Sequence, residues 1–436
     1  MLNRVEKMLE FVFNSPTSYQ AVDSIKKELK EEGFKELIES DSWQIEKGGK
    51  YYVVRNHSSI IAFKIGNKLE HPSFHVMASH SDVPSFKIKP RSKNDNAGYE
   101  IINTEVYGGP IYNTWMDRLL SIAGRLIIRD KDEIIIKPIC LNYPVCLIPN
   151  LAIHMNRMVN DGVKLNPQVD LMPMCSKDKD FDMMKLIAKE YEINVEDIID
   201  TDLFLYPYEK GRVWGSDNEF VSAYHLDDLQ CAYTTLQGFK QGENSDTISM
   251  YCCFDNEEVG SGTKQGADST FLMDILARIQ SGLKMSDDEL KQALASSMIV
   301  SADNAHAVHP NHPEKSDPTN KVEMNEGIVI KYNANQSYTT DGISASLFKE
   351  ICRQSGLSWQ TYTNRSDERG GGTLGAISIA HVSILSVDIG CAQLAMHSAL
   401  ETAGSKDVDT MIEASKSFYD SHIVRTGQNS YRVWKV

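Results

Sequence analysis

The sequence lacks the features that mark membrane proteins and disulfide-rich secreted proteins. Its apolar runs, such as those at 134–136 and 297–301, are much shorter than the roughly 20 residues that cross a bilayer. The opening stretch MLNRVEKMLEFV has neither the long apolar core nor the cleavage site of a signal peptide. The eight cysteines include no C-x-x-C pair, which argues against a disulfide framework and against a thiolate zinc site. We therefore predict a soluble protein of the reducing cytoplasm.

Positive charge is also scarce. The formal net charge is −15, and the most basic short stretch, KIKPRSK at 87–93, contains only four cations. A nucleic acid or an anionic membrane would be repelled by such a chain unless a local basic patch overcame the global charge. We therefore expect neither of these partners.

The chain does contain a regular alternation of helical and strand-like segments. Its 436 residues, 41% of them hydrophobic, are enough for one large core or two ordinary domains. Strand-like segments at 50–56, 59–66 and 74–79 follow two predicted helices within 3–31. After residue 223, helix and strand patterns alternate again, and AISIAHVSILSVDIG at 376–390 is predicted as strand. The pattern indicates an α/β fold with a mixed central sheet and helices on both faces.

Between these two regions the regular alternation of helix and strand patterns is interrupted. Residues 91–223 contain polar loops, strand-like segments and one clear helical pattern near FDMMKLIAKEYEI. We predict that 91–223 is an inserted domain. It would interrupt a discontinuous catalytic domain made of residues 1–90 and 224–436.

Several apolar, strand-like runs end in side chains that bind metal cations. FHVMAS leads into His80, SMYCCFDN leads into Glu258, and SSMIVSA leads into Asp303. In an open α/β sheet, ligands bind beyond the carboxyl ends of the strands. Two further candidates are Asp227, which opens a helical run, and His397, which follows a strand after a short loop.

This set of two histidines, two aspartates and one glutamate suits zinc, cobalt or manganese better than calcium. Five ligands are too many for one catalytic zinc ion, but they suffice for two ions that share a carboxylate. We assign His80 and Asp303 to one ion, Glu258 and His397 to the other, and Asp227 to both. Two ions about 3.5–4 Å apart generate a hydroxide at neutral pH and polarise a carbonyl group.

Two neighbours of these ligands have predicted roles of their own. Glu257 precedes a ligand, so it can reach the reacting water without binding metal and act as general base and then as general acid. Asp82 lies two residues beyond His80 and would share its side of an extended chain. We expect Asp82 to accept the second imidazole N–H of His80 and so fix its tautomer.

Each of these features alone is weak evidence. With 12 histidines and 60 acidic residues, an H-x-D or an E-E sequence arises by chance. An aspartate at a helix start, such as Asp227, is more often an N-cap, and His397 is equally compatible with a hydrogen-bonded core histidine. The joint pattern is what favours a metal site. Of the histidines that follow Asp303, His309 is the best candidate to line its pocket.

Several segments together resemble one known family in order and across most of the chain. They are ASHSDVPSFKIKP, LAIHMNR, EDIIDTDLFLYP, LDDLQCAYTTLQGF, FDNEEVGSGTKQGADS, SADNAHAVHPNHP, IKYNANQSY and QLAMHSALETAG. The chain is thereby similar to the M18 family of aspartyl aminopeptidases. The resemblance implies a di-zinc catalytic domain interrupted by a dimerisation domain, and a large homo-oligomer, typically a tetrahedral dodecamer.

The resemblance also implies roles for individual residues. It gives the same five metal ligands and the same general base, Glu257, as the residues themselves suggest. It further implies that His154, in LAIHMNR, reaches the active site of a neighbouring subunit. Lys331 and His309 are implied to contact the substrate.

The sequence departs from the family pattern near the expected substrate pocket. Asp228 stands where the family usually has asparagine, and RSDERGGGTLG at 365–375 is an unusual version of a loop expected to border the specificity pocket. We predict hydrolysis of N-terminal residues, acidic ones in particular, from short peptides. Two alternatives remain open: a metallohydrolase that acts on acylated amino acids or peptides, and a non-catalytic assembly protein stabilised by metal.

Overall fold

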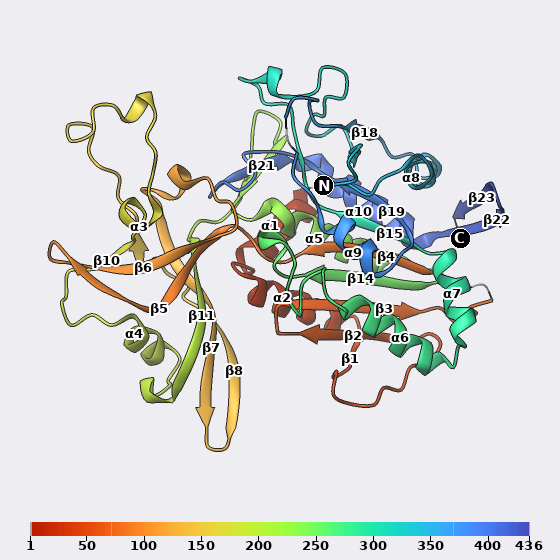
Figure 1. Ribbon diagram of the computed structural model, residues 1–436, viewed down its shortest axis with the longest axis horizontal. Helices are drawn as coiled ribbons and strands as arrows, with labels where there is room; N and C mark the ends of the chain where they lie inside the picture. Colours follow the sequence, from red (N-terminus) through yellow and green to blue (C-terminus); the bar gives the residue numbers. More distant parts are fainter. Residues whose placement is uncertain (1, 71, 369, 436) are drawn as a thin grey trace.

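The computed structural model describes residues 2–70, 72–368 and 370–435, and its ribbon shows two lobes side by side (Figure 1). The larger lobe is built on a nine-stranded sheet with the order β1-β2-β3-β14-β4-β15-β19-β17-β18. Its strands are β1 (Lys35–Glu36), β2 (Lys50–Arg55), β3 (Ser59–Ile65), β4 (Phe74–His80), β14 (Ile248–Phe254), β15 (Met298–Ala302), β17 (Ile328–Lys331), β18 (Trp359–Tyr362) and β19 (Leu385–Gly390).

Parallel pairing at the centre of this sheet brings several strand ends to one edge. β4 pairs in parallel with both β14 and β15, and β15 pairs in parallel with β19. The register places Phe254, the last residue of β14, beside His80, the last residue of β4. The segments that follow β4, β14 and β15 therefore start close together. Antiparallel pairs at β2–β3, β3–β14 and β17–β19 make the sheet mixed, as predicted.

Helices cover both faces of the sheet. One face carries α1 (Leu2–Phe13), α2 (Ser18–Glu31), α5 (Leu226–Gln241), α8 (Gly342–Gln354) and α10 (Ser405–Asp420), and the other carries α6 (Phe271–Leu283), α7 (Asp287–Ala295) and α9 (Leu374–His381). Each set buries its apolar side against the sheet. Cys253 belongs to the first core and Cys252 to the second, because successive strand side chains point to opposite faces. The predicted α/β fold with helices on both faces is confirmed.

The prediction for 376–390 was wrong in its first half. Residues Leu374–His381 form the helix α9, and the strand β19 begins only at Leu385. A short apolar run reads alike in a buried strand and in a buried helix, so periodicity does not separate the two. Packing decides the case, since Leu374 is fully buried in the core between α6 and the sheet.

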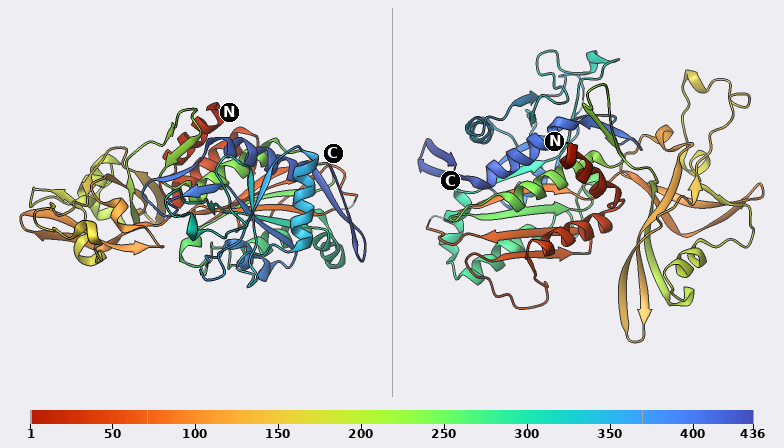
Figure 2. Two further views of the ribbon diagram at one scale, coloured as in Figure 1. Left: turned by 90° about the horizontal axis from the view of Figure 1, so that it is seen from above. Right: turned by 180° about the vertical axis from the view of Figure 1, so that it is seen from behind.

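The smaller lobe is an antiparallel sheet with its own core. Its seven strands have the order β11-β5-β6-β10-β9-β7-β8, and β11 also pairs with β7, so that the strand order closes on itself. Views from above and from behind show this lobe beside the larger one (Figure 2). The strands are β5 (Ser85–Asn96), β6 (Tyr99–Tyr107), β7 (Leu119–Asp130), β8 (Glu133–Cys140), β9 (Cys146–Leu147), β10 (Met174–Ser176) and β11 (Ile198–Pro207), and the helices are α3 (Pro167–Asp170) and α4 (Met183–Glu190).

A third, five-stranded sheet joins distant parts of the chain. Its order is β12-β13-β21-β20-β16, with β12 (Arg212–Trp214), β13 (Phe220–Ala223), β16 (Ala305–His306), β20 (Ala392–Leu394) and β21 (Glu401–Gly404). β12 and β13 lie within residues that the sequence placed in the inserted domain, but β13 pairs with β21 of the C-terminal region and β12 pairs with β13. The chain ends in a hairpin of β22 (Ser421–Gly427) and β23 (Ser430–Lys435).

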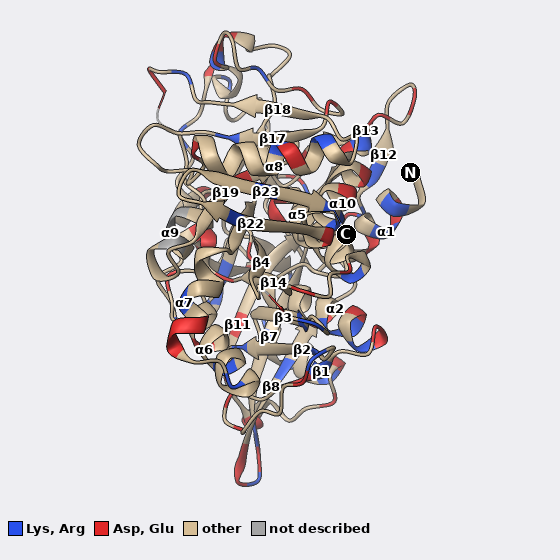
Figure 3. Cartoon of the chain, turned by 90° about the vertical axis from the view of Figure 1, so that its right-hand side faces the viewer, with Lys and Arg blue, Asp and Glu red and all other residues tan. Residues whose placement is uncertain are grey.

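The charge on the surface is mixed. On the face that Figure 3 presents, basic and acidic segments are interspersed, and the first turn of α7 is acidic. Within the described ranges, no helix has both the length and the apolar character that a bilayer span requires.

The tight contact between β19 and the segment after β15 yields a first prediction. A Cβ added at Gly390 would overlap the backbone carbonyl of Asp303, which has no room to move. We expect Gly390→Ala to lower the free energy of unfolding by roughly 1–3 kcal/mol, measured as a lower Tm, because overpacking forces the backbone apart. Gly342→Ala is the control, since a Cβ there meets open space at the exposed start of α8. Equal Tm values for the two variants would contradict the contact.

Candidate metal centre

Five metal-binding side chains meet at the edge where the parallel strands end. His80 is the last residue of β4, and Asp303 follows β15 directly. Glu258 lies in the short helix η4 (Glu257–Val259) just after β14, and Asp227 lies in the first turn of α5. His397 lies in the loop between β20 and β21.

The carboxylate of Asp227 lies between the two histidines. Its Oδ1 is 3.6 Å from His80 Nε2, and its Oδ2 is 3.5 Å from His397 Nε2. His397 Nε2 is also 3.3 Å from Glu258 Oε2. Ligand atoms of His80, Asp227 and Asp303 lie within 4.8 Å of one another, and so do those of Asp227, Glu258 and His397. The geometry thus forms two three-residue groups that have Asp227 in common.

The second ring nitrogen of each histidine is held by a backbone carbonyl. His80 Nδ1 lies 3.1 Å from the carbonyl oxygen of Asp82, and His397 Nδ1 lies 3.1 Å from that of Gly109. A carbonyl oxygen only accepts, so Nδ1–H donates in both rings, and in the neutral imidazole the lone pair is on Nε2. That lone pair faces the carboxylates, which is the tautomer a metal ligand needs.

The electrostatics of the cluster are those of crowded, buried carboxylates. Burial, with the nearby charge of Asp227, raises the pKa of Glu258 well above its usual value, and the same two causes raise the pKa of Glu401 to about 8. Burial acts to lower the pKa of His80, but the carboxylates of Asp227 and Asp82 outweigh it and raise that pKa. Burial acts to raise the pKa of Asp227, but His397 and His80 outweigh it and hold that pKa well below its usual value. Protons in the cluster are therefore bound more tightly by Glu258 and His80, and more weakly by the carboxylate between the histidines.

The residues therefore fit divalent cations. Among the described side chains, Asp227 Oδ1 and Glu258 Oε1 are buried and accept no hydrogen bond from the protein. A buried carboxylate oxygen without a partner is costly unless a cation meets it. The mixture of imidazole and carboxylate suits zinc.

Glu257 lies beside the cluster, next to Glu258 in η4. Burial, with the charges of Asp303 and Asp82, raises its pKa to about 7. Ligand atoms of Glu257, His80 and Glu258 also lie within 4.8 Å of one another, so distance alone does not separate a base from a ligand. A carboxyl group with this pKa exchanges protons readily near neutral pH.

Asp82 has more partners than the sequence suggested. Its Oδ1 is 3.4 Å from His80 Nδ1, close to the expected contact. The same carboxylate also accepts the backbone N–H groups of Glu257 at 3.0 Å and Glu258 at 3.2 Å. It accepts the hydroxyl of Tyr107 as well, at 2.7 Å. Asp82 thus holds the backbone of η4 in addition to orienting an imidazole.

Sequence reasoning missed a second carboxylate of this kind, Glu401. Its Oε2 accepts the N–H of Asp227 at 2.8 Å, and its Oε1 accepts the N–H of His397 at 2.6 Å. Glu401 is buried in β21, four residues after His397. Its sequence signal is an acidic residue inside a short strand, which does not reveal its contact with Asp227, 174 residues earlier.

A cavity of about 330 Å³ opens onto the cluster. Its wall includes Lys331, whose Nζ donates to the carbonyls of Asp303 at 2.8 Å and Asn304 at 3.2 Å. His306 also lines the cavity, together with Tyr338. From the 365–375 loop, residues 371–373 reach the cavity wall, while Arg369 lies outside the described residues.

Two histidines implied by the resemblance lie outside this cavity within one chain. His309 is exposed and packs on His312, with 5.3 Å between the ring centroids. His306, three residues earlier, lines the cavity instead of His309, because it lies in β16, which runs beside the site. His154 lies exposed in an irregular segment of the smaller lobe.

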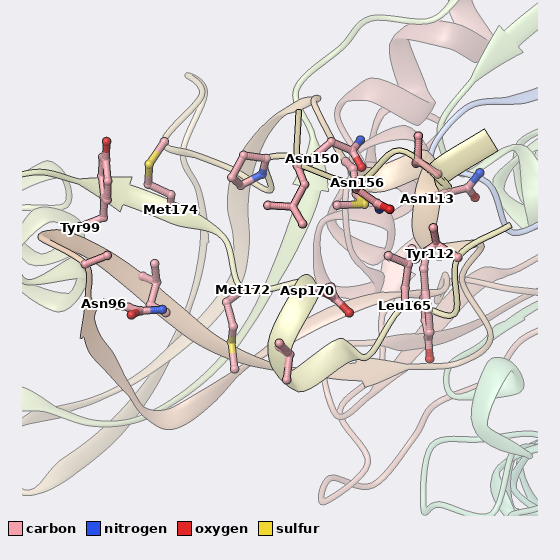
Figure 4. Close-up of a pocket in the computed structure, with 18 of the residues that line it drawn as sticks. Asn96, Tyr99, Tyr112, Asn113, Asn150, Asn156, Leu165, Asp170, Met172 and Met174 are labelled. Atoms are coloured by element: carbon pink, nitrogen blue, oxygen red, sulfur yellow. The ribbon is translucent and has the colours of Figure 1, made fainter. Parts of the chain in front are cut away.

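A larger cavity, of about 1340 Å³, lies in the smaller lobe and not at the cluster. Figure 4 shows its wall, with Asn96, Tyr99 and Met174 from the strands on one side and Asn150, Asn156 and Leu165 from the long irregular segment on the other. This segment exposes apolar side chains, including Leu151, Met155 and Met158. The cavity carries no cluster of titratable groups, so its chemistry differs from that of the metal centre.

Comparisons with known proteins point to one family. The model of the family described as "Aminopeptidase I zinc metalloprotease (M18)" matches residues 11–419. A protein of Clostridium novyi named "Probable M18 family aminopeptidase 2" is 46% identical over 432 residues, covering 96% of this chain and 100% of that protein. A protein of the same name from Clostridium acetobutylicum is 45% identical, covering 96% of this chain and 99% of its own.

Solved structures agree with this result. One titled as a complex of Ape4 and Nbr1 superposes with a TM-score of 0.92 at 34% identity, covering 96% of this chain and 85% of that chain. Another, the mApe1 dodecamer of S. cerevisiae, superposes with a TM-score of 0.84 at 29% identity, covering 96% and 97%.

The two hydrogen bonds of Glu401 lead to a prediction about metal affinity. We expect Glu401→Ala to weaken zinc binding by roughly 10–100-fold, because the backbones of Asp227 and His397 lose their shared acceptor. Competition with a chromogenic chelator measures the affinity. Glu6→Ala, at an exposed position of α1, serves as the control. Wild-type zinc affinity in a folded Glu401→Ala protein would rule out this role.

Proposed function

The chain belongs to the M18 family of zinc metalloproteases, and from that premise we propose that it is a dinuclear zinc aminopeptidase that removes N-terminal residues from peptides. The observation that carries the proposal is the position of Asp227 between two histidines, each of which completes a separate three-residue group. A single-ion site would have no use for the second group.

The proposed ligands form two sets, one for each ion, and follow the two three-residue groups of the structure. His80 and Asp303 would hold one ion, Glu258 and His397 the other, and Asp227 both. Zinc is the favoured metal, with cobalt or manganese as substitutes of similar ligand preference. When bound, such a pair lowers the pKa of water and polarises a carbonyl group.

The protein's own proton carrier in this proposal is Glu257. Its carboxylate removes a proton from the attacking water, and the resulting carboxyl group returns that proton to the leaving amine. A pKa of about 7 suits both halves of the cycle, since the group must gain and lose a proton at neutral pH. Asp82 assists by fixing the backbone of Glu257 and Glu258.

Lys331 supports a preference for acidic N-terminal residues. Burial acts to lower its pKa, but the carboxylate of Asp303 outweighs this and raises the pKa, so that the ammonium group stays charged. Its charge lies in the wall of the cavity, near His306. An acidic side chain that entered the cavity would be attracted to this ammonium group, while burial and the charge of Lys331 lower the pKa of His306 and keep its ring neutral.

The smaller lobe is proposed as the dimerisation domain of a homo-oligomer, with a tetrahedral dodecamer as the expected assembly. The exposed apolar side chains of residues 151–169 are the surface that a second copy of the chain would cover. His154 lies within this segment, so the prediction that it reaches a neighbouring active site is tied to the same interface. All eight cysteines are unpaired, which fits the proposed cytoplasmic location.

Glu257 provides the most direct test of this mechanism. We expect Glu257→Gln to lower kcat by roughly 10²–10⁴-fold while both zinc ions remain bound, because only the proton carrier is lost. Turnover and zinc content by elemental analysis are measured on the same sample. Glu258→Gln is the matched comparison and should lose zinc as well as activity. Substantial turnover by Glu257→Gln would remove this residue from the role of base.

Lys331 tests the proposed preference. We expect Lys331→Met to lower kcat/KM for aspartyl substrates more than for alanyl substrates, changing their ratio by roughly 10–100-fold, because a charge-assisted contact is lost. Lys321→Met, at an exposed position, is the control. A wild-type ratio in Lys331→Met would exclude Lys331 from recognition.

Two experiments test the alternatives, a metallohydrolase of acylated substrates and a non-catalytic assembly protein stabilised by metal. Free and N-acetylated peptides are compared, and cleavage of the acetylated series alone would favour an acylase. Particle size is followed during chelation, and a particle that dissociates without any activity to lose would favour the assembly protein.

A further inference from the structure

One short segment of the smaller lobe, Tyr107–Thr114, contacts the metal centre; it runs from the end of β6 into the 3₁₀ helix η1 (Tyr112–Trp115). The segment leaves the sheet of the smaller lobe at Tyr107 and passes along the ligands that surround one of the two proposed ions. We propose that this segment positions Glu258 and His397, and thereby sets the affinity of the ion that they hold. The inference rests on the proposed two-ion function.

The first contact acts on Glu258 through Asp82. The hydroxyl of Tyr107 donates to Asp82 Oδ2 at 2.7 Å and accepts from Asn256 Nδ2 at 2.9 Å. The same Asp82 oxygen accepts the N–H of Glu258 at 3.2 Å. Tyr107 thus fixes the carboxylate that holds the backbone of a ligand.

The next two residues approach the ligands directly. Gly108 has a φ of +69°, and a Cβ there would lie 3.1 Å from Cβ of Glu258. Gly109 offers its carbonyl oxygen to His397 Nδ1 at 3.1 Å. A backbone conformation that favours glycine therefore brings the chain close enough to orient the imidazole.

Two further bonds hold the loop that carries His397. The N–H of Ile111 donates to the carbonyl of His397 at 3.0 Å. The hydroxyl of Thr114 accepts the N–H of Ala399 at 3.0 Å and donates to the carbonyl of Ile111 at 2.6 Å. Glu401 holds the other side of this loop, through the N–H of His397.

The contacts are unequal between the two proposed ions. The Tyr107–Thr114 segment contacts His397 directly and approaches Glu258. It reaches His80 indirectly, because Tyr107 donates to one oxygen of Asp82 and the other oxygen lies 3.4 Å from His80 Nδ1. A change in the segment should therefore act on one ion more than on the other. A general loss of folding would act on both.

The test uses the full-length protein loaded with zinc. Tyr107→Phe removes one hydroxyl and keeps the ring that packs edge-on against Phe204 at 5.5 Å. Zinc release to a chromogenic chelator is followed in time. We expect one of the two ions to be bound roughly 10–100-fold more weakly, and the other to be weakened much less, because the segment reaches His80 through Asp82 alone among the contacts described.

Kinetics supply a readout that a purely structural role would not change. In limiting zinc, Tyr107→Phe should show a lower kcat with an unchanged KM, and added zinc should restore kcat. Tyr208→Phe is the matched control, because it removes a tyrosine hydroxyl of the same lobe that donates at 2.6 Å to Asn142, away from the centre. It should retain wild-type release of both ions.

Thr114→Val tests the same proposal through the loop of His397, and it decides the matter if Tyr107→Phe fails to fold. Wild-type release of both ions from the folded variants would overturn the inference while leaving the two-ion function intact. Equal weakening of both ions would also overturn it. A wild-type protein that binds a single zinc ion would overturn the two-ion function and this inference together.

Discussion

The structure depends on a concentration of buried negative charge that the protein alone does not neutralise. Asp227, Glu258 and Asp303 converge with two histidines, and buried carboxylate oxygens among them accept no hydrogen bond from the described residues. Burying such charges is unfavourable unless cations meet them. The pKa values of His80 and Glu258 are raised for the same reason, because a bound proton also offsets negative charge. The arrangement of strand ends at this edge of the sheet therefore makes cation binding favourable.

Two further carboxylates keep the ligands in place without facing the cations themselves. Asp82 accepts two N–H groups from η4, and Glu401 accepts one from Asp227 and one from His397. Each thus joins segments that lie far apart in the sequence. Lys331 contributes as a cation, since its ammonium group holds the carbonyl of Asp303 and places a positive charge in the cavity wall.

The two lobes have different relations to this centre. The nine-stranded sheet supplies His80 and the strand ends that precede Glu258 and Asp303, so its parallel pairing fixes their mutual position. The smaller lobe supplies no proposed ligand, yet its Tyr107–Thr114 segment contacts the other side of the centre. The same lobe carries the exposed apolar segment and the larger cavity. The proposed assembly surface and the candidate metal centre consequently belong to segments that the Tyr107–Thr114 stretch joins.

The sequence by itself determined the α/β class, most helices and strands, and the five metal-binding candidates, because these depend on local periodicity and on polar residues at strand ends. It did not separate helix from strand at 376–381, where a short apolar run fits both and packing decides. It favoured His309 over His306, since only the path of β16 directs one of them to the cavity. Glu401 and the carbonyl of Gly109 gave no signal, because a hydrogen bond between segments hundreds of residues apart leaves no local pattern. Such contacts exist only once tertiary structure has brought the segments together.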